Sequence, residues 1–130
     1  MIAKADRLTP AQIEAVLRAF EDGETATAAA FWADEGVFID PQYPDAKYSG
    51  PDEIRNALDW ALDHIVEEPG LAVRKIWADD DETFAVEVDT HHRMHDGTTV
   101  DFPQVFIIEG DNGQITRWQS YLPFPPPSSE

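Results

Sequence analysis

The chain has no cysteine among its 130 residues, and it has few basic residues, nine Lys and Arg against 26 Asp and Glu. The absence of cysteine excludes disulfide bonds, thiolate metal sites and a cysteine nucleophile. The formal net charge of −17 argues against nucleic acid as a partner, because phosphate binding depends on Lys and Arg. Such acidity is typical of a well-solvated surface.

Long apolar runs are also missing. No run approaches the roughly 18 residues that a membrane-spanning helix needs, and residues 1–7 lack the core of a signal peptide. We therefore expect a cytoplasmic protein with no membrane partner. With 42% hydrophobic residues, the chain is long enough to bury a core. We predict a single domain over residues 1–130, with a Pro-rich C-terminal tail at 124–130.

In the first half of the chain, apolar residues recur at the three- to four-residue spacing of helices. A capping-box pattern at Thr9 and Gln12 predicts a helix that continues to about Asp22. A second helix is expected over 24–32, ending by Gly36, and a third over 51–65. Between them we expect a short strand at 37–40 and a loop at 41–50.

After Leu71 the apolar period changes to two, which is typical of strands. Four strands are predicted, over 73–78, 83–95, 98–109 and 114–122. Their short connections favour an antiparallel meander. The fold class is therefore α+β, with three N-terminal helices packed on a strongly curved, mainly antiparallel sheet. Such a sheet forms a cone that is open at one end, where we expect a small hydrophobic molecule to bind.

Three segments in this order resemble a known family: 31–41 (FWADEGVFIDP), 48–54 (YSGPDEI) and 113–123 (GQITRWQSYLP). The chain is similar, over about residues 8–123, to the nuclear-transport-factor-2-like superfamily with its cystatin-like cone. Within the superfamily, the chain resembles the SnoaL-like and ketosteroid-isomerase-like branches. The resemblance implies acid–base chemistry without a cofactor, of isomerase, hydrolase or cyclase type, on a hydrophobic substrate.

Asp40 is a carboxylate at the end of an apolar strand, where an unpaired charge costs several kcal/mol. Ketosteroid isomerases carry their general base in the same Asp-Pro motif, so the resemblance implies that Asp40 abstracts a proton. The residues alone leave a second interpretation open, in which Asp40 accepts hydrogen bonds from the following loop and caps it.

Other positions depart from the patterns of the relatives. The tyrosine donor of the isomerases falls at or near Val16, and their acidic donor falls near Gln104 or Val105. In limonene epoxide hydrolases, the strand Arg and Asp correspond to Glu87 and Asp89 here. The acid near the end of their last strand, like the base of the SnoaL-like cyclases, corresponds to Ser120.

Strand alternation places Glu87, Asp89 and His91 on one face. This acidic face either lines the cone or faces solvent. If it lines the cone, Asp89 and His91 are catalytic residues that assist Asp40, and Glu87 contacts the substrate. Coupled titration would then raise the pKa of some of these carboxyls.

The histidines at 91, 92 and 95 also suggest a metal site, with Asp89 and His91 as a chelating pair. However, His91 and His92 point in opposite directions on a strand, and the chain has no helical H-E-x-x-H motif. We predict no metal, and histidines that lie on the surface near the hairpin at Asp96-Gly97.

Substrate contacts are expected from two regions. Tyr43 and Tyr48 lie on the loop at the cone mouth, where a phenol donates a hydrogen bond. The other expected contacts come from the last two strands and are Phe102, Gln104, Trp118 and Ser120.

Three functions remain open. The first is a cofactor-independent enzyme, and the second is a non-catalytic ligand-binding protein that uses the same cavity. A cone filled by Phe38, Phe102 and Trp118 would exclude both. The third is a homodimerisation module whose exposed sheet face carries a combination of Trp77, Phe106, Ile108 and Trp118.

Overall fold

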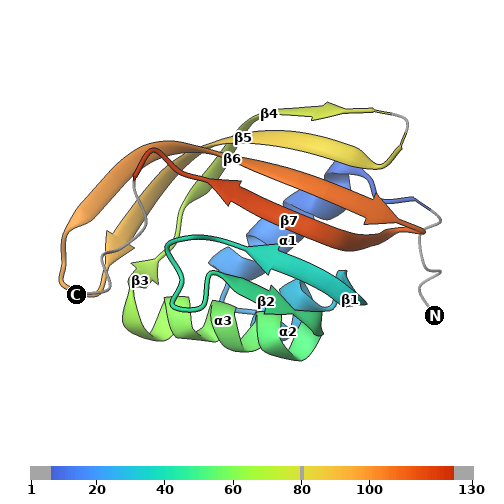
Figure 1. Ribbon diagram of the computed structural model, residues 1–130. Helices are drawn as coiled ribbons and strands as arrows, with labels where there is room; N and C mark the ends of the chain where they lie inside the picture. The colour runs from blue at the N-terminus through green and yellow to red at the C-terminus, as the bar shows by residue number, and fades with distance from the viewer. Residues whose placement is uncertain (1–6, 80, 125–130) are drawn as a thin grey trace.

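In the computed structural model, a seven-stranded sheet curls around the helices (Figure 1). The structure describes residues 7–79 and 81–124. The helices are α1 (Pro10–Glu21), α2 (Thr25–Ala29) and α3 (Gly50–His64). The strands are β1 (Trp32–Ile39), β2 (Lys47–Ser49), β3 (Val66–Glu68), β4 (Leu71–Ala78), β5 (Thr83–Met94), β6 (Thr99–Asp111) and β7 (Gln114–Tyr121). This arrangement confirms the predicted α+β fold, with a strongly curled mixed sheet.

The strand order is β2-β1-β7-β6-β5-β3, and β4 also pairs with β5. Strands β4 to β7 form the predicted antiparallel meander. Strand β1 lies parallel to β7, with Phe38 opposite Trp118 and Ile39 opposite Gln119. This long-range pairing brings the residues that follow β1 next to the end of β7.

Helix α1 begins as the sequence predicts. The Thr9 side chain accepts a hydrogen bond from the Gln12 N–H, and the Gln12 side chain accepts one from the Thr9 N–H. These two bonds satisfy backbone donors that have no partner within the helix. At the other end of the helix, Glu21 Oε2 accepts a hydrogen bond from the Leu71 N–H at 2.7 Å. Helix α1 is thereby attached to the start of β4.

Two local predictions were wrong, and one short strand was not predicted. The second helix ends at Ala29, and the chain from Trp32 is already strand because it pairs with β7. The predicted loop at 41–50 contains β2, which pairs with the end of β1. Strand β3 follows α3 directly. Strands of three residues are too short to show a period in the sequence, so only their pairing defines them.

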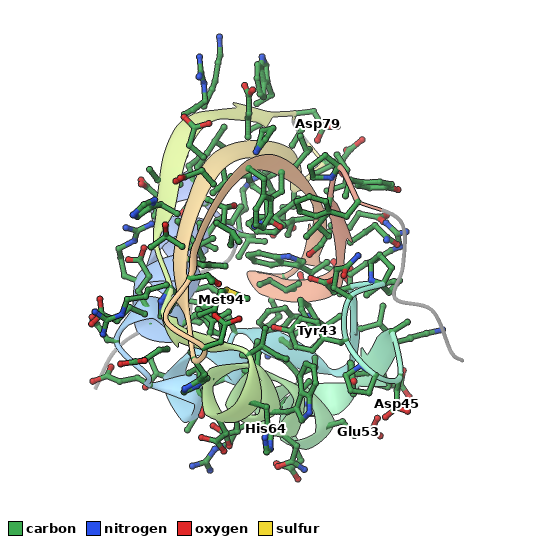
Figure 2. All side chains as sticks on the ribbon, turned by 90° about the vertical axis from the view of Figure 1, so that its left-hand side faces the viewer. Tyr43, Asp45, Glu53, His64, Asp79 and Met94 are labelled. Atoms are coloured by element: carbon green, nitrogen blue, oxygen red, sulfur yellow. The ribbon has the colours of Figure 1, made fainter. Side chains whose placement is uncertain are left out.

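The sheet arches over the helices when it is viewed from the side (Figure 2). In this view Tyr43 and Met94 lie inside the arch, whereas Asp79 lies at its outer side. The edge of β5 is covered by β3 and then by β4, with a break at Gly70. A Cβ atom at Gly70 would lie 2.4 Å from the carbonyl oxygen of His91. Only glycine allows this close approach of the two backbones.

The sequence predicts a Pro-rich tail at the C-terminus. Apart from Phe124, the predicted tail at 124–130 lies outside the described residues. Within the part of the chain that the structure describes, none of the helices is long and apolar enough to cross a membrane.

Candidate active site

A cavity of about 420 Å³ lies between the concave face of the sheet and the helices. This volume falls in the range of about 300–1,000 Å³ that is typical of small-molecule sites. Its walls are mostly apolar and aromatic. Six polar side chains interrupt them: Asp40, Gln42, Tyr43, His92, Gln104 and Ser120. The cone is therefore not filled by Phe38, Phe102 and Trp118, which form parts of its wall.

Asp40 follows β1 directly and is only 7% exposed. Its Oδ1 accepts a hydrogen bond from the Gln42 N–H at 2.9 Å, and its own N–H donates to the Ala46 carbonyl at 2.8 Å. The Asp40 side chain thus caps the following turn, as the second interpretation of this residue expects. The carboxyl group also lines the cavity, so it is in a position to meet a ligand.

Burial raises the pKa of the Asp40 carboxyl to about 6, because the charged form loses its hydration. The hydrogen bond from Gln42 and the nearby Ser120 hydroxyl act in the opposite direction. At neutral pH the carboxylate is the major form, and this pH is close to the pKa of the group. A general base is most effective in this situation.

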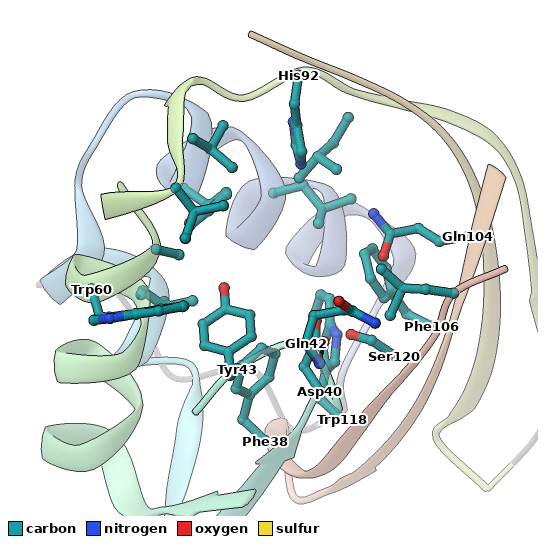
Figure 3. Close-up of a pocket in the computed structure, with 18 of the residues that line it drawn as sticks. Phe38, Asp40, Gln42, Tyr43, Trp60, His92, Gln104, Phe106, Trp118 and Ser120 are labelled. Atoms are coloured by element: carbon teal, nitrogen blue, oxygen red, sulfur yellow. Dashed lines mark hydrogen bonds between the residues drawn. The ribbon is translucent and has the colours of Figure 1, made fainter. Parts of the chain in front are cut away.

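Tyr43 lies on the loop after Asp40, and its hydroxyl points into the cavity (Figure 3). The ring packs against Phe38 at 5.2 Å and Trp60 at 5.6 Å between ring centroids. Burial, together with the charge of Asp40, raises the pKa of the Tyr43 phenol far above its usual value. The phenol therefore stays protonated and can donate a hydrogen bond next to the base.

Trp118 and Ser120 lie on β7 beside Asp40 (Figure 3). The parallel pairing of β1 with β7 causes this proximity. Within the described residues, the buried side-chain atoms without a hydrogen-bond partner are Trp118 Nε1 and Ser120 Oγ. The hydroxyl is still near enough to Asp40 to lower the pKa of that carboxyl, although it forms no hydrogen bond of ideal geometry. Two donors without partners therefore lie in the wall that holds the base.

His92 and Gln104 lie on a different wall of the cavity (Figure 3). His92 Nδ1 accepts a hydrogen bond from the Gly70 N–H at 3.2 Å, so Nε2 carries the proton in the neutral ring. Burial and the neighbouring His91 lower the pKa of His92 to about 4. The nitrogen of the Gln104 amide donates to Thr90 Oγ1 at 2.7 Å. The amide oxygen of Gln104 is therefore the atom that can accept a hydrogen bond from a ligand.

The acidic face of β5 is directed away from the cavity. Asp89 and His91 are exposed and Glu87 is half-buried, and none of them lines the cavity. Asp89 forms an ion pair with Arg74 at 3.5 Å, and His91 contacts Asp101. The interpretation that this face lines the cone was therefore wrong. Thr90 and His92 occupy the inner face instead, because alternate residues point to opposite sides of a strand.

The other expected contacts have mixed outcomes. Tyr43, Phe102, Gln104, Trp118 and Ser120 all line the cavity. Tyr48 does not line it, because it is buried behind Tyr43 and its hydroxyl accepts a hydrogen bond from the Asp45 N–H at 3.1 Å.

His92 is the residue that our sequence interpretation missed. We expected the histidines at the surface near the hairpin, but the alternation that places His91 outside places His92 inside. That signal was present in the sequence, yet it could be used only once the inner face of β5 was known. Among the described residues, no group of three or more metal-ligating side chains occurs.

The SnoaL-like domain family matches residues 13–118. None of the curated proteins matches the chain. A protein of ketosteroid-isomerase-like fold from Catenulispora acidiphila, solved in complex with trimethylamine, shares 18% identity, covers 87% of this chain and 85% of its own, and has a TM-score of 0.78.

Two further solved structures are similar. A putative polyketide cyclase from Xanthomonas campestris pv. campestris is 25% identical, with 84% of this chain and 85% of its own covered and a TM-score of 0.71. An LEH-like epoxide hydrolase from M. tuberculosis is 21% identical, with 85% of this chain and 78% of its own covered and a TM-score of 0.70. Since the family matches most of the chain and the fold agrees, the chain belongs to the SnoaL-like domain family.

Proposed function

We propose that the protein is a cofactor-independent acid–base enzyme that acts on a hydrophobic small molecule, with Asp40 as the general base. One observation carries this proposal: a buried carboxyl with a pKa of about 6 lies in the wall of an apolar cavity of about 420 Å³. A carboxylate that served only as a turn cap would not need to face a cavity of ligand size.

The proposed chemistry is proton transfer at a carbon next to a carbonyl group. The Asp40 carboxylate takes the proton, and the electron pair of the C–H bond moves toward the carbonyl oxygen to form an enolate. The protonated Tyr43 hydroxyl donates a hydrogen bond to the oxygen on which negative charge develops. Asp40, now a neutral acid, returns the proton to the same or another carbon. No further reactant is required for this cycle.

Two of the similar structures support acid–base chemistry in this fold, since they are described as a putative polyketide cyclase and an LEH-like epoxide hydrolase. The third contains a bound small molecule. Glu87 and Asp89 stand at the positions of the strand Arg and Asp of limonene epoxide hydrolases. Both residues lie outside the cavity, so they have no role in the proposed reaction. Proton transfer by Asp40 requires neither of them.

Deuterium exchange into 2-tetralone tests the proposal without knowledge of the natural substrate. This bicyclic ketone is apolar and has an acidic C–H group beside its carbonyl. We expect exchange in D₂O, followed by proton NMR, to increase with pH and to reach half of its plateau rate near pH 6, because only the ionised Asp40 accepts a proton. The exposed Asp89→Asn variant serves as a control and should show the same profile. A rate that shows no such inflection would contradict the assignment of Asp40 as base.

We further propose that two copies associate through the outer face of the sheet. Of the four residues expected on that face, Phe106, Ile108 and Trp118 are buried on the inside, so that expectation was wrong for them. Trp77 is 48% exposed and Tyr121 is 53% exposed. Strand register aligns Trp77 with Ala85 and Ile107, and Tyr121 with Val105. These side chains form an apolar patch on the outer face, next to Lys75 and Glu87, and such a patch is typical of an interaction site.

Sedimentation velocity at micromolar concentration tests this association. We expect a dimer for the native chain and a monomer for Ile107→Lys, because a charge in the centre of the contact would lose its hydration. Ala72→Lys, at another exposed position of the sheet, is the matched control and should remain dimeric. A native chain that sediments only as a monomer would exclude the dimer.

A further inference from the structure

The inner end of His92 is a hydrogen-bond donor that the proposed proton transfer does not use. The ring reaches from β5 toward the cavity, and Figure 3 shows it across the open space from Tyr43 and Asp40. The Gly70 N–H holds Nδ1, which leaves the protonated Nε2 as the atom for a ligand. Edge-to-face packing on Phe102, with ring centroids 6.1 Å apart, restricts the orientation of the imidazole.

The close contact between backbones at Gly70 makes this donor rigid. The His91 N–H donates to the Gly70 carbonyl at 2.8 Å, directly beside the bond from Gly70 to His92. A ring that is held on one nitrogen, packed on one face and kept neutral by burial is a fixed donor rather than a proton carrier. Its natural partner is an uncharged oxygen acceptor.

The charges around the cavity restrict the ligand further. The described residues that line it include the carboxyl of Asp40 but no Lys or Arg. An anionic ligand would therefore lose its hydration without gaining a cationic partner, and Asp40 would repel it. An ammonium group would pair with the Asp40 carboxylate, but it cannot accept hydrogen bonds, so it would leave the donors Tyr43 and His92 unpaired. Both arguments favour an uncharged ligand with acceptor oxygens.

We propose that the substrate is an uncharged, mainly apolar ketone with a second oxygen, which accepts a hydrogen bond from His92 at the end of the cavity away from Asp40. This inference rests on the proposed function, because it names the substrate class of the same cavity. His92 is a specificity-determining residue in this arrangement. It selects for the second oxygen and takes no part in the proton transfer.

Calorimetric titration with a matched ligand series tests the second hydrogen bond. The probes are 2-tetralone and its 6-methoxy and 7-methoxy derivatives, which add one ether oxygen on the ring away from the ketone. We expect at least one methoxy compound to bind about 5-fold more tightly than the parent, as one additional hydrogen bond allows. In His92→Phe the ratio of the two affinities, methoxy compound to 2-tetralone, should fall to about one, so the comparison is made within each variant. A gain that persists in His92→Phe, or no gain with either derivative, would overturn the proposal.

Direct observation of the ring provides a second test that requires no variant. In native protein labelled with ¹⁵N at histidine, the Nε2 resonance of His92 should shift when the favoured methoxy compound binds and much less when 2-tetralone binds. Equal shifts with both probes would contradict a bond to the second oxygen. This measurement remains decisive if His92→Phe does not fold.

The charge preference is tested with the same scaffold at pH 7. We expect 1,2,3,4-tetrahydro-2-naphthoate to bind at least ~10-fold more weakly than 2-tetralone, because its carboxylate would be buried near Asp40 without a cationic partner. 2-Aminotetralin, whose ammonium group pairs with Asp40 but leaves the donors Tyr43 and His92 unpaired, should bind no more tightly than 2-tetralone. Tighter binding of either charged compound would overturn the uncharged class. The titrations are repeated in Asp40→Asn. If the methoxy compound still binds more tightly than 2-tetralone in Asp40→Asn, the hydrogen bond from His92 is supported even when deuterium exchange is absent. The substrate class and the catalytic role of Asp40 can therefore fail separately.

Discussion

Replacing Asp40 with Asn is expected to lower the rate of deuterium exchange into 2-tetralone by about 10²–10⁴-fold, the usual contribution of a positioned general base. The amide keeps the size of the carboxyl group, and its oxygen can still accept the hydrogen bond from Gln42. It cannot take a proton at neutral pH, however. The expected loss therefore lies in the rate of proton transfer, while the dissociation constant of 2-tetralone changes little.

Two controls separate this effect from a general disturbance. Asp89→Asn makes the same chemical change on the outer face of β5, where it should leave the exchange rate within about 2-fold of the native value. Circular dichroism should show that both variants are folded. If Asp40→Asn retained the native exchange rate and ligand affinity, the catalytic assignment would fail. Any activity would then have to be attributed to another group, and the cavity would be better explained as a non-catalytic binding site.

The second large effect concerns stability and its dependence on pH. The pKa of Asp40 is about 6 in the folded chain against the ordinary value of 3.8, so between these pH values the folded state holds a proton that the unfolded state has lost. The ionised carboxyl therefore destabilises the folded state. The free energy of unfolding decreases as the pH rises from about 3.8 to about 6. Above pH 6 the penalty reaches about 3 kcal/mol, from the size of the pKa shift.

Asp40→Asn should remove this penalty. We expect the variant to gain stability relative to the native chain as pH increases from 4 to 7, by about 3 kcal/mol in total. Urea unfolding at a series of pH values gives the difference between the two proteins, in which the titration of the other acidic residues largely cancels. A difference that is independent of pH, or that favours the native chain at pH 7, would show that Asp40 is mainly a turn cap with an ordinary or low pKa.

The order of the elements could be predicted from particular residues. The capping box at Thr9 and Gln12 defines the start of α1 through local hydrogen bonds, so the sequence alone contains it. The alternation from Thr83 onward predicts β5, and the turn at Asp96-Gly97 predicts its hairpin with β6. The short strands β2 and β3 could not be predicted in this way, because three residues show no apolar period and only pairing defines them, with β1 for β2 and with the distant β5 for β3.

The candidate site was predictable in part for the same reason. Asp40 was identified because a carboxylate after an apolar strand requires a partner or a function. Asp89, His91 and Glu87 were placed at the site because the sequence shows two faces of β5 without showing which is concave. The curl of the sheet decided that question, and it exchanged His91 for His92 in the cavity wall.

The sequence by itself determined α1, α3, the meander and the presence of a carboxyl at the end of β1, because these depend on local hydrogen bonds and on the periodicity of apolar residues. The tertiary structure alone decided what surrounds that carboxyl. The parallel pairing of β1 with β7 places Ser120 and Trp118 beside Asp40, and the curl of β5 and β6 directs His92 and Gln104 inward. Burial by these distant segments raises the pKa of Asp40, since desolvation depends on the whole fold rather than on sequence neighbours.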